Sequence, residues 1–61
     1  MSQGRPYAVT GSGIPEIYPG TLAGLLAAIG RARELSICGP HEVRKDGKVV
    51  KRFEDGREVA A

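Results

Sequence analysis

The chain has 61 residues, with nine basic and seven acidic side chains and a formal net charge of +2, a balance that identifies no class of partner by itself. A chain of this length forms at most one domain and buries only about 60% of its unfolded surface, so nearly every large apolar side chain is needed in the core. The longest apolar run, Leu22 to Ile29, is far shorter than the roughly 20 residues of a membrane span. We therefore expect neither a membrane-inserted protein nor one with a dedicated small-molecule pocket.

The cysteine content indicates the cellular compartment. Cys38 is the only cysteine, which excludes an intrachain disulfide. No signal-peptide pattern follows Met1, and a lone thiol is typical of a reducing compartment, so we expect a cytoplasmic protein. Small cores are usually reinforced by disulfides, a metal or a second subunit, and a homodimer is the simplest reinforcement left to this chain.

The first part of the chain predicts an arm and a hairpin. Residues 1–6 are polar and have nothing to bury, which predicts a flexible N-terminal arm before a single domain over residues 7–61. Two strand-like runs, residues 7–10 and 14–18, are separated by Gly11-Ser12-Gly13, a composition typical of a three-residue hairpin loop. Pro15 places the second strand at a sheet edge, because proline donates no ladder hydrogen bond.

A helix is predicted next. Pro19-Gly20 interrupts the preceding strand, and Thr21 stands where an N-cap hydroxyl would accept a bond from a free backbone amide, so the helix should begin at Leu22. Apolar residues then recur at helical spacing and predict one side that faces the core, formed by Leu22, Leu25, Leu26 and Ile29. Gly39-Pro40 ends any helix, because proline cannot continue it.

The predicted helix also has a face of small residues, Ala23, Gly24, Ala27, Ala28 and Gly30. Glycine inside a helix costs about 1 kcal/mol, which indicates a compensating close approach of another backbone. That backbone belongs either to the chain's own sheet or to a second copy.

The last third of the chain predicts a three-stranded meander. Asp46-Gly47 lies between β-prone flanks and predicts a two-residue type I′ turn, with Lys45 opposite Lys48, Arg44 opposite Val49, Val43 opposite Val50 and Glu42 opposite Lys51. Asp55-Gly56 predicts a second turn that pairs residues 52–54 with residues 57–59. In this register Val43, Val50 and Val59 share one face of the sheet, and Val49, Lys51 and Phe53 share the other.

These elements predict an α+β fold with one helix packed on an antiparallel sheet, in the order ββαβββ or βαβββ. In overall look the short chain, rich in alanine, glycine and arginine, is similar to small proteins of high-GC bacteria and their phages. That likeness covers no functional residue.

No group of residues predicts catalysis, a metal or a cofactor. Cys38 and His41 are close in sequence, but a metal site needs three or four ligands and Glu42 is the only other nearby candidate. The Gly11-Ser12-Gly13 loop lacks the Lys-Ser/Thr of a phosphate-binding loop. The adjacent acids Glu54 and Asp55 belong to a β-turn and not to a cleft.

Two binding functions remain. The first is a non-catalytic protein-binding module, self-association included, that uses the sheet face of Val49, Lys51 and Phe53 and also the small-residue face of the helix. The alternative is nucleic-acid binding by the basic meander, through Arg44, Lys45, Lys48, Lys51, Arg52 and Arg57. Interleaved acidic residues reduce the charge of that meander, which favours the protein-binding hypothesis.

Overall fold

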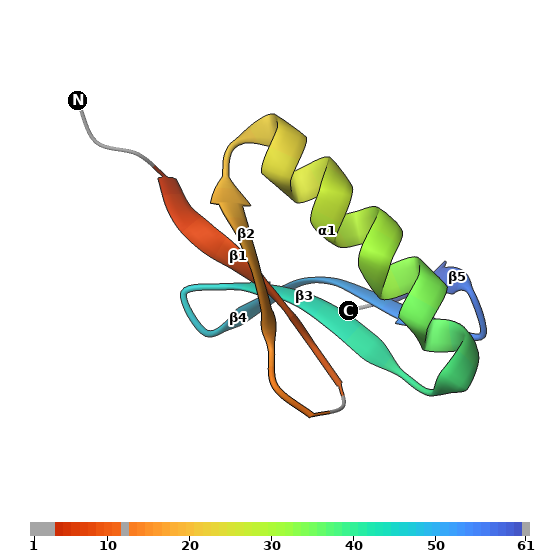
Figure 1. Cartoon of the computed structure of the whole chain (residues 1–61). Helices are drawn as coiled ribbons and strands as arrows, with labels where there is room; N and C mark the ends of the chain where they lie inside the picture. The colour runs from red at the N-terminus through yellow and green to blue at the C-terminus, as the bar shows by residue number, and fades with distance from the viewer. Residues whose placement is uncertain (1–3, 12, 61) are drawn as a thin grey trace.

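A computed structural model of the chain describes residues 4–11 and 13–60. These residues form one helix packed on a five-stranded antiparallel sheet (Figure 1), so the predicted ββαβββ order is confirmed. The elements are β1 (Gly4–Thr10), β2 (Glu16–Gly20), α1 (Leu22–Leu35), a 3-10 turn η1 (Ser36–Cys38), β3 (His41–Lys45), β4 (Lys48–Glu54) and β5 (Arg57–Val59).

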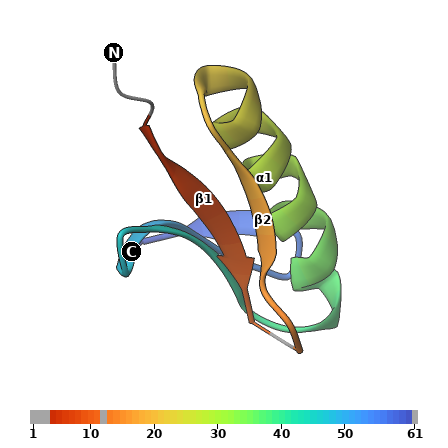
Figure 2. The same ribbon diagram turned by 60° about the vertical axis from the view of Figure 1, so that its left-hand side comes forward.

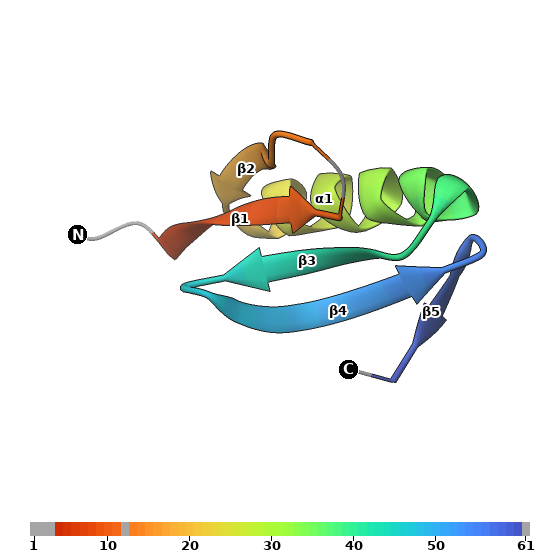
Figure 3. The ribbon, with the colours of Figure 1, turned by 90° about the horizontal axis from the view of Figure 1, so that it is seen from below.

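The sheet joins the two halves of the sequence. Its strand order is β2-β1-β3-β4-β5, so the first hairpin and the meander meet where β1 pairs with β3 and Val9 lies opposite Val43. The helix lies against one face of the sheet, mainly over β2, β1 and β3, and its C-terminal half also contacts β4 (Figures 2 and 3). The sheet consequently has one face partly covered by α1 and a second face that no element of the described residues covers, which we call the outer sheet face.

The first hairpin has different boundaries from those predicted. The strand β1 begins at Gly4, which pairs with Gly20, so residues 4–6 belong to the sheet and not to an arm; residues 1–3 lie outside the described residues. The strand β2 begins only at Glu16, and Ile14 and Pro15 belong to the connection. Proline is nevertheless found in the edge strand, at Pro19, where a missing amide hydrogen is tolerated.

The helix begins as predicted. Thr21 is the N-cap, and its hydroxyl accepts a hydrogen bond from the Gly24 amide at 3.1 Å. The helix ends at Leu35 and continues as the 3-10 turn η1, after which Gly39 and Pro40 lead into β3. Thr21 is also the only residue between β2 and α1, so the helix must fold back directly onto the strand that precedes it.

The side of the helix that faces the sheet is only partly the predicted one, because Leu25 and Ile29 pack against the core but Leu22 and Leu26 do not. The buried helical residues are Gly24, Ala28 and Ala32, whereas Leu22 and Leu26 are 72% and 59% exposed. A Cβ atom on Gly24 would overlap the carbonyl group of Pro19, so the single-residue link brings the first helical turn against the backbone of β2. This link rotates the small residues inward and the two leucines outward, against the preference of their side chains.

The meander contains a β-bulge that the predicted register lacks. Both turns have the predicted positive φ angles, and Lys45 opposite Lys48 and Arg44 opposite Val49 are confirmed. Val50 is then an extra residue, so Val43 pairs with Lys51 and not with Val50. One added residue reverses the faces of everything that follows it on β4, because side chains alternate along a strand.

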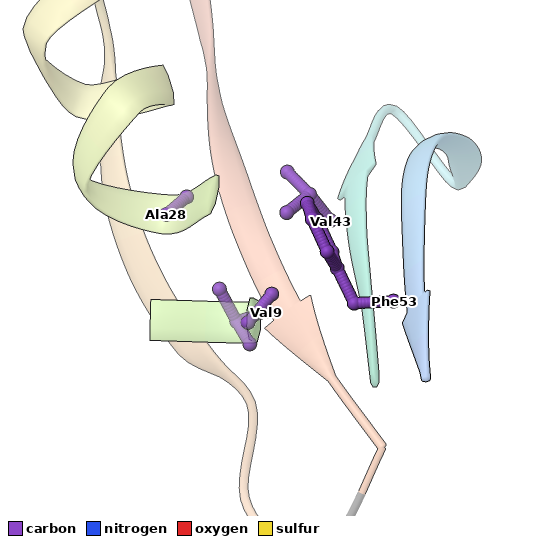
Figure 4. Close-up of a cluster of buried hydrophobic side chains, with 5 residues drawn as sticks. Val9, Ala28, Val43 and Phe53 are labelled. Atoms are coloured by element: carbon purple, nitrogen blue, oxygen red, sulfur yellow. The ribbon is translucent and has the colours of Figure 1, made fainter. Parts of the chain in front are cut away.

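The core is correspondingly small (Figure 4). Val9 of β1, Val43 of β3 and Phe53 of β4 meet Ala28 and Ala32 of α1, and each of these five is at most 3% exposed. Partly buried apolar side chains surround them, namely Tyr7, Tyr18, Leu25, Ile29 and Leu35. From its length, the chain was expected to use nearly all of its large apolar residues in the core. Four of them are nevertheless largely exposed, namely Leu22, Leu26, Ile14 and Ile17.

Ser36 connects the end of the helix to the last turn of the chain. Its hydroxyl donates a hydrogen bond to the Arg33 carbonyl at 2.7 Å and accepts one from the Gly56 amide at 2.8 Å. Its own carbonyl accepts the Asp55 amide at 3.1 Å. This fully buried serine therefore fixes the β4–β5 turn against the helix, a role that nothing in the sequence indicated.

Candidate functional site: the outer helix face

The most unusual surface of the molecule is the side of α1 that points away from the sheet. We call it the outer helix face and define it as the exposed residues Leu22, Ala23, Leu26, Ala27 and Gly30. All five lie in the first nine residues of the helix, a stretch of about 13 Å at 1.5 Å per residue. None of them carries a polar or charged side chain.

A surface helix normally has charged or polar residues opposite its buried side. From Leu22 to Gly30 this helix has no polar side chain on any side, and a helix that is apolar all round is ordinarily buried all round. The first polar side chain of α1 is Arg31, which is turned toward β2. The outer helix face thus has the composition of an interior surface while it is exposed in the isolated chain.

The glycines distinguish the two sides of the helix. Gly24 is buried, and the Pro19 carbonyl group leaves no room for a side chain there. Gly30 is exposed, and a Cβ atom added to it would have no atom of residues 4–11 or 13–60 within 4 Å. The close approach predicted for the small residues is therefore made to the chain's own strand at Gly24, whereas Gly30 makes no such approach to any described residue.

The predicted protein-binding residues do not form one surface. Phe53 is 0% exposed, so it cannot contact a partner while the chain is folded. The bulge at Val50 is the physical reason, since it turns Phe53 and Lys51 to the helix-covered face and leaves Val49, which pairs with Arg44, on the outer sheet face. The predicted grouping of Val43 with Val59 is wrong for the same reason, because Val59 pairs with Arg52 on the outer sheet face.

The six basic residues of the nucleic-acid hypothesis are divided between both faces, and most of them have partners. Arg44 and Arg52 both bind Glu42 on the outer sheet face. On the other face Lys51 binds Glu58, and the ammonium group of Lys45 lies 5.1 Å from the centre of the Tyr7 ring. The remaining two, Lys48 and Arg57, are exposed at opposite ends of the meander.

Glu42 is the centre of the outer sheet face. One of its carboxylate oxygens accepts the Arg44 Nε at 3.0 Å, and the other accepts the Arg52 Nε at 3.1 Å. Partial burial tends to raise the pKa of this carboxyl, but the hydrogen bonds from the two arginines outweigh that effect and the pKa of Glu42 lies below its ordinary value. The group is held as a carboxylate, which cancels one of the two positive charges beside it.

A second network holds the helix against the edge strand. The Arg31 guanidinium binds both carboxylate oxygens of Glu16, at 3.0 and 3.2 Å, and the Tyr18 hydroxyl donates a hydrogen bond to Glu16 at 2.8 Å. The hydrogen bond from Arg31 is the main reason that the pKa of Glu16 is lowered, and the bond to Glu16 raises the pKa of Tyr18. The contact between Arg31 and Glu16 joins α1 to the edge strand β2.

The lowered pKa values of Glu42 and Glu16 predict that the fold loses stability at acidic pH. A carboxyl whose pKa is lower in the folded than in the unfolded chain stabilises the fold above its unfolded pKa and loses that contribution as pH falls through its folded pKa. The melting temperature should therefore be nearly constant from pH 7 to about pH 5 and fall steadily below about pH 4.5. Circular dichroism melts between pH 7 and pH 2.5 measure this.

The variant Glu42→Gln tests whether the hydrogen bonds of Glu42 to Arg44 and Arg52 contribute to this loss of stability in acid. It should melt below the wild type at pH 7, because Arg44 and Arg52 lose their partner, and the difference should shrink as the wild-type carboxyl becomes protonated. Glu54→Gln, an exposed carboxyl at the end of β4, is the matched control. A difference between Glu42→Gln and wild type that stays constant from pH 7 to pH 2.5 would contradict the assignment.

The residues considered for catalysis or metal binding form no recognisable site in the part of the chain that the structure describes. His41 is 4% exposed at the start of β3, with its Nδ1 2.8 Å from the Gly39 carbonyl oxygen, while Cys38 is exposed in η1. Among residues 4–11 and 13–60 no three His, Cys, Asp or Glu side chains are grouped as metal ligands, and no pocket is found. Within the same residues, no helix has both the length and the apolar character needed to cross a bilayer.

Sequence reasoning included Ala23, Ala27 and Gly30 of the outer helix face in a contact surface but missed Leu22 and Leu26, because it assigned the large apolar residues to the core by their spacing alone. One sequence feature could have exposed the error: the run from Leu22 to Gly30 lacks the polar side that a surface helix needs.

Comparison with protein-family models, with curated proteins and with solved structures found no match to this chain.

Proposed function

We propose that this chain is a small, non-catalytic, cytoplasmic protein-binding domain whose binding surface is the outer helix face. The observation that carries the proposal is the exposure of Leu22 and Leu26, at 72% and 59%, on a helical segment without any polar side chain. Exposed apolar surface that is contiguous and regular is typical of an interaction site, whereas single exposed apolar residues are not.

The chemistry of this face favours a protein partner. It offers no charge or hydrogen-bonding side chain with which to select a phosphate or a polar small molecule, so recognition must come from shape and apolar burial. A helix with leucines beside alanines and glycine is suited to another helix, because small residues let two helices approach closely and leucines fill the spaces beside them. The partner surface is therefore expected to be apolar and helical.

A capture experiment with matched variants tests the proposal. The tagged wild type, Leu26→Glu and Ile14→Glu are each used to isolate partners from cells of the organism that encodes the chain. Ile14 is 89% exposed and lies in the β1–β2 connection, away from the outer helix face, so it is the control for adding a charge at an exposed apolar position. A partner that binds wild type and Ile14→Glu, is lost with Leu26→Glu, and binds again when purified supports the proposal.

The nucleic-acid alternative predicts salt-dependent DNA binding that does not depend on Leu26. Binding that depends on phosphate contacts weakens steeply as salt is raised, by about one power of salt concentration for each phosphate neutralised. Titration of mixed-sequence duplex DNA at 50 and 200 mM salt measures this slope. Salt-sensitive binding that is unchanged in Leu26→Glu but lost in Lys45→Glu/Lys48→Glu would contradict the protein-binding proposal and favour the basic meander.

A further inference from the structure

We infer that the tip of the β3–β4 hairpin binds an acidic segment of a polypeptide through three basic side chains, Arg5, Lys45 and Lys48. We call these three residues the basic tip. The basic tip shares no residue with the outer helix face and binds by charge, so it is a second binding surface beyond the proposed function. Its position, its charge and the repulsion within it each support this assignment.

The fold brings Arg5 to the hairpin. Lys45 and Lys48 flank the Asp46-Gly47 turn and lie directly opposite each other. The strand β1 pairs with β3 so that Tyr7 lies opposite Lys45, which places the beginning of β1 at the same end of the sheet as this turn (Figure 3). There the Arg5 Nε lies 3.5 Å from a carboxylate oxygen of Asp46. Three cations that are far apart in the sequence order thus surround one turn.

The basic tip accounts for the excess charge of the chain. The whole sequence has nine basic and seven acidic residues. The basic tip and its turn contain three of the basic residues and one acidic residue, so six residues of each sign remain elsewhere. Three other cations of the meander are already paired with Glu42 or Glu58, namely Arg44, Lys51 and Arg52. An anionic partner is therefore attracted most strongly to the basic tip.

The arrangement of the two lysines is unfavourable for the isolated chain. Like charges directly opposite each other on neighbouring strands destabilise a sheet. Within residues 4–11 and 13–60 neither lysine forms an ion pair, since the carboxylate between them is bound to Arg5 and the Lys45 ammonium lies over the Tyr7 ring. A bound anion would neutralise this repulsion, so the same two residues favour the complex.

The size of the basic tip favours carboxylates of a polypeptide over nucleic acid. Proteins that bind duplex DNA commonly make about 6–10 phosphate contacts, whereas the basic tip has three cations with Asp46 among them. Binding of single strands relies on exposed aromatic rings, but Tyr7 is half-buried and the Lys45 ammonium lies over its ring. A segment with two or three carboxylates matches the three cations.

Fluorescence anisotropy of a labelled peptide of about ten glutamates measures the binding. At about 20 mM salt the wild type should bind it saturably, and affinity should fall about tenfold or more at about 200 mM salt, because salt screens exposed charges. Lys48→Glu and Arg5→Glu should each weaken binding by about tenfold or more. Arg57→Glu is the matched control, since Arg57 is exposed at the other end of the meander and the change in net charge is the same. It should remain within about twofold of the wild type.

A second readout excludes unfolding as the cause. Lys48→Glu places opposite charges across the strand pair, so it should melt above the wild type at low salt, by about 1–5 °C. Weaker binding by a more stable protein is the result that a site at the basic tip requires. A Lys48→Glu protein that both binds and melts like the wild type would overturn the inference.

Three further outcomes would overturn it. The first is no binding of the glutamate peptide up to about 1 mM protein at low salt. The second is an equal loss in Arg57→Glu, which would show a response to net charge alone. The third is a mixed-sequence duplex that binds more tightly than the peptide and depends on the same residues, which would make the basic tip a phosphate site. Leu26→Ala should bind the peptide like the wild type, so failure of the outer helix face is distinguishable from failure of the basic tip.

Discussion

Replacing Phe53 with alanine is expected to remove about half or more of the protein's folding stability at 25 °C. Phe53 is completely buried among Val9, Val43 and two alanines of the helix, so removal of its ring would leave a cavity in the core. Phenylalanine-to-alanine changes in such sites cost about 3–5 kcal/mol. A domain of this size has a total stability of only about 3–9 kcal/mol, at about 0.05–0.15 per residue, so the loss is a large part of the whole.

Urea unfolding followed by circular dichroism measures the effect, with two variants as controls. Phe53→Leu keeps most of the apolar volume and should lose only about 1–1.5 kcal/mol. Ile17→Ala removes a large apolar side chain that is 64% exposed on the outer sheet face and should change stability by less than about 0.5 kcal/mol. A Phe53→Ala protein as stable as Ile17→Ala would show that the bulge does not turn Phe53 into the core.

The second large effect is expected at Gly24. In Gly24→Ala the new methyl group would overlap the Pro19 carbonyl, which belongs to the backbone and cannot rotate away as a side chain could. The helix would have to move off β2 and open the contacts of Ala28 and Ala32. We expect a net loss of about 2 kcal/mol or more, since the strain of overpacking exceeds the roughly 1 kcal/mol that alanine gains in helix propensity.

Gly30→Ala is the matched change in the same helix. Its methyl group has open space around it, so the variant should be more stable than the wild type by about 1 kcal/mol, or about 4–8 °C in melting temperature, when measured in dilute solution. Thermal melts of the two variants at about 1 µM compare them directly. Equal changes in melting temperature for the two variants would contradict the placement of Gly24 against β2 and of Gly30 on the exposed side of α1.

Local sequence patterns were sufficient for the elements and the two turns of the meander. The pairs Asp46-Gly47 and Asp55-Gly56 adopt the predicted positive φ angles, because few other residues tolerate them, and Thr21 caps the helix as its hydroxyl and position suggested. Each of these features depends on residues within a few positions of one another, so each can be predicted from the local sequence.

The faces of the elements were not predictable in the same way. A bulge at Val50 and a one-residue link at Thr21 each change which side chains point inward, and neither alters the spacing of apolar residues along the chain. Hydrophobic periodicity indicates that a helix has an apolar side but not that the connection allows this side to reach the sheet. The candidate site follows from these two geometric features, which is why the sequence alone directed attention to Phe53 and not to Leu26.

Ser36 has a consequence for how parts of the molecule come apart. Its hydroxyl and carbonyl together hold the Asp55 and Gly56 amides, so a turn between two short terminal strands is tied to the end of the central helix. Fraying of the helix end breaks these bonds and releases the turn, and release of the turn removes two of the hydrogen bonds that the buried Ser36 accepts. The C-terminal turn of α1 and the β4–β5 hairpin should accordingly exchange their amide hydrogens as one cooperative unit, although edge strands of three residues usually open on their own.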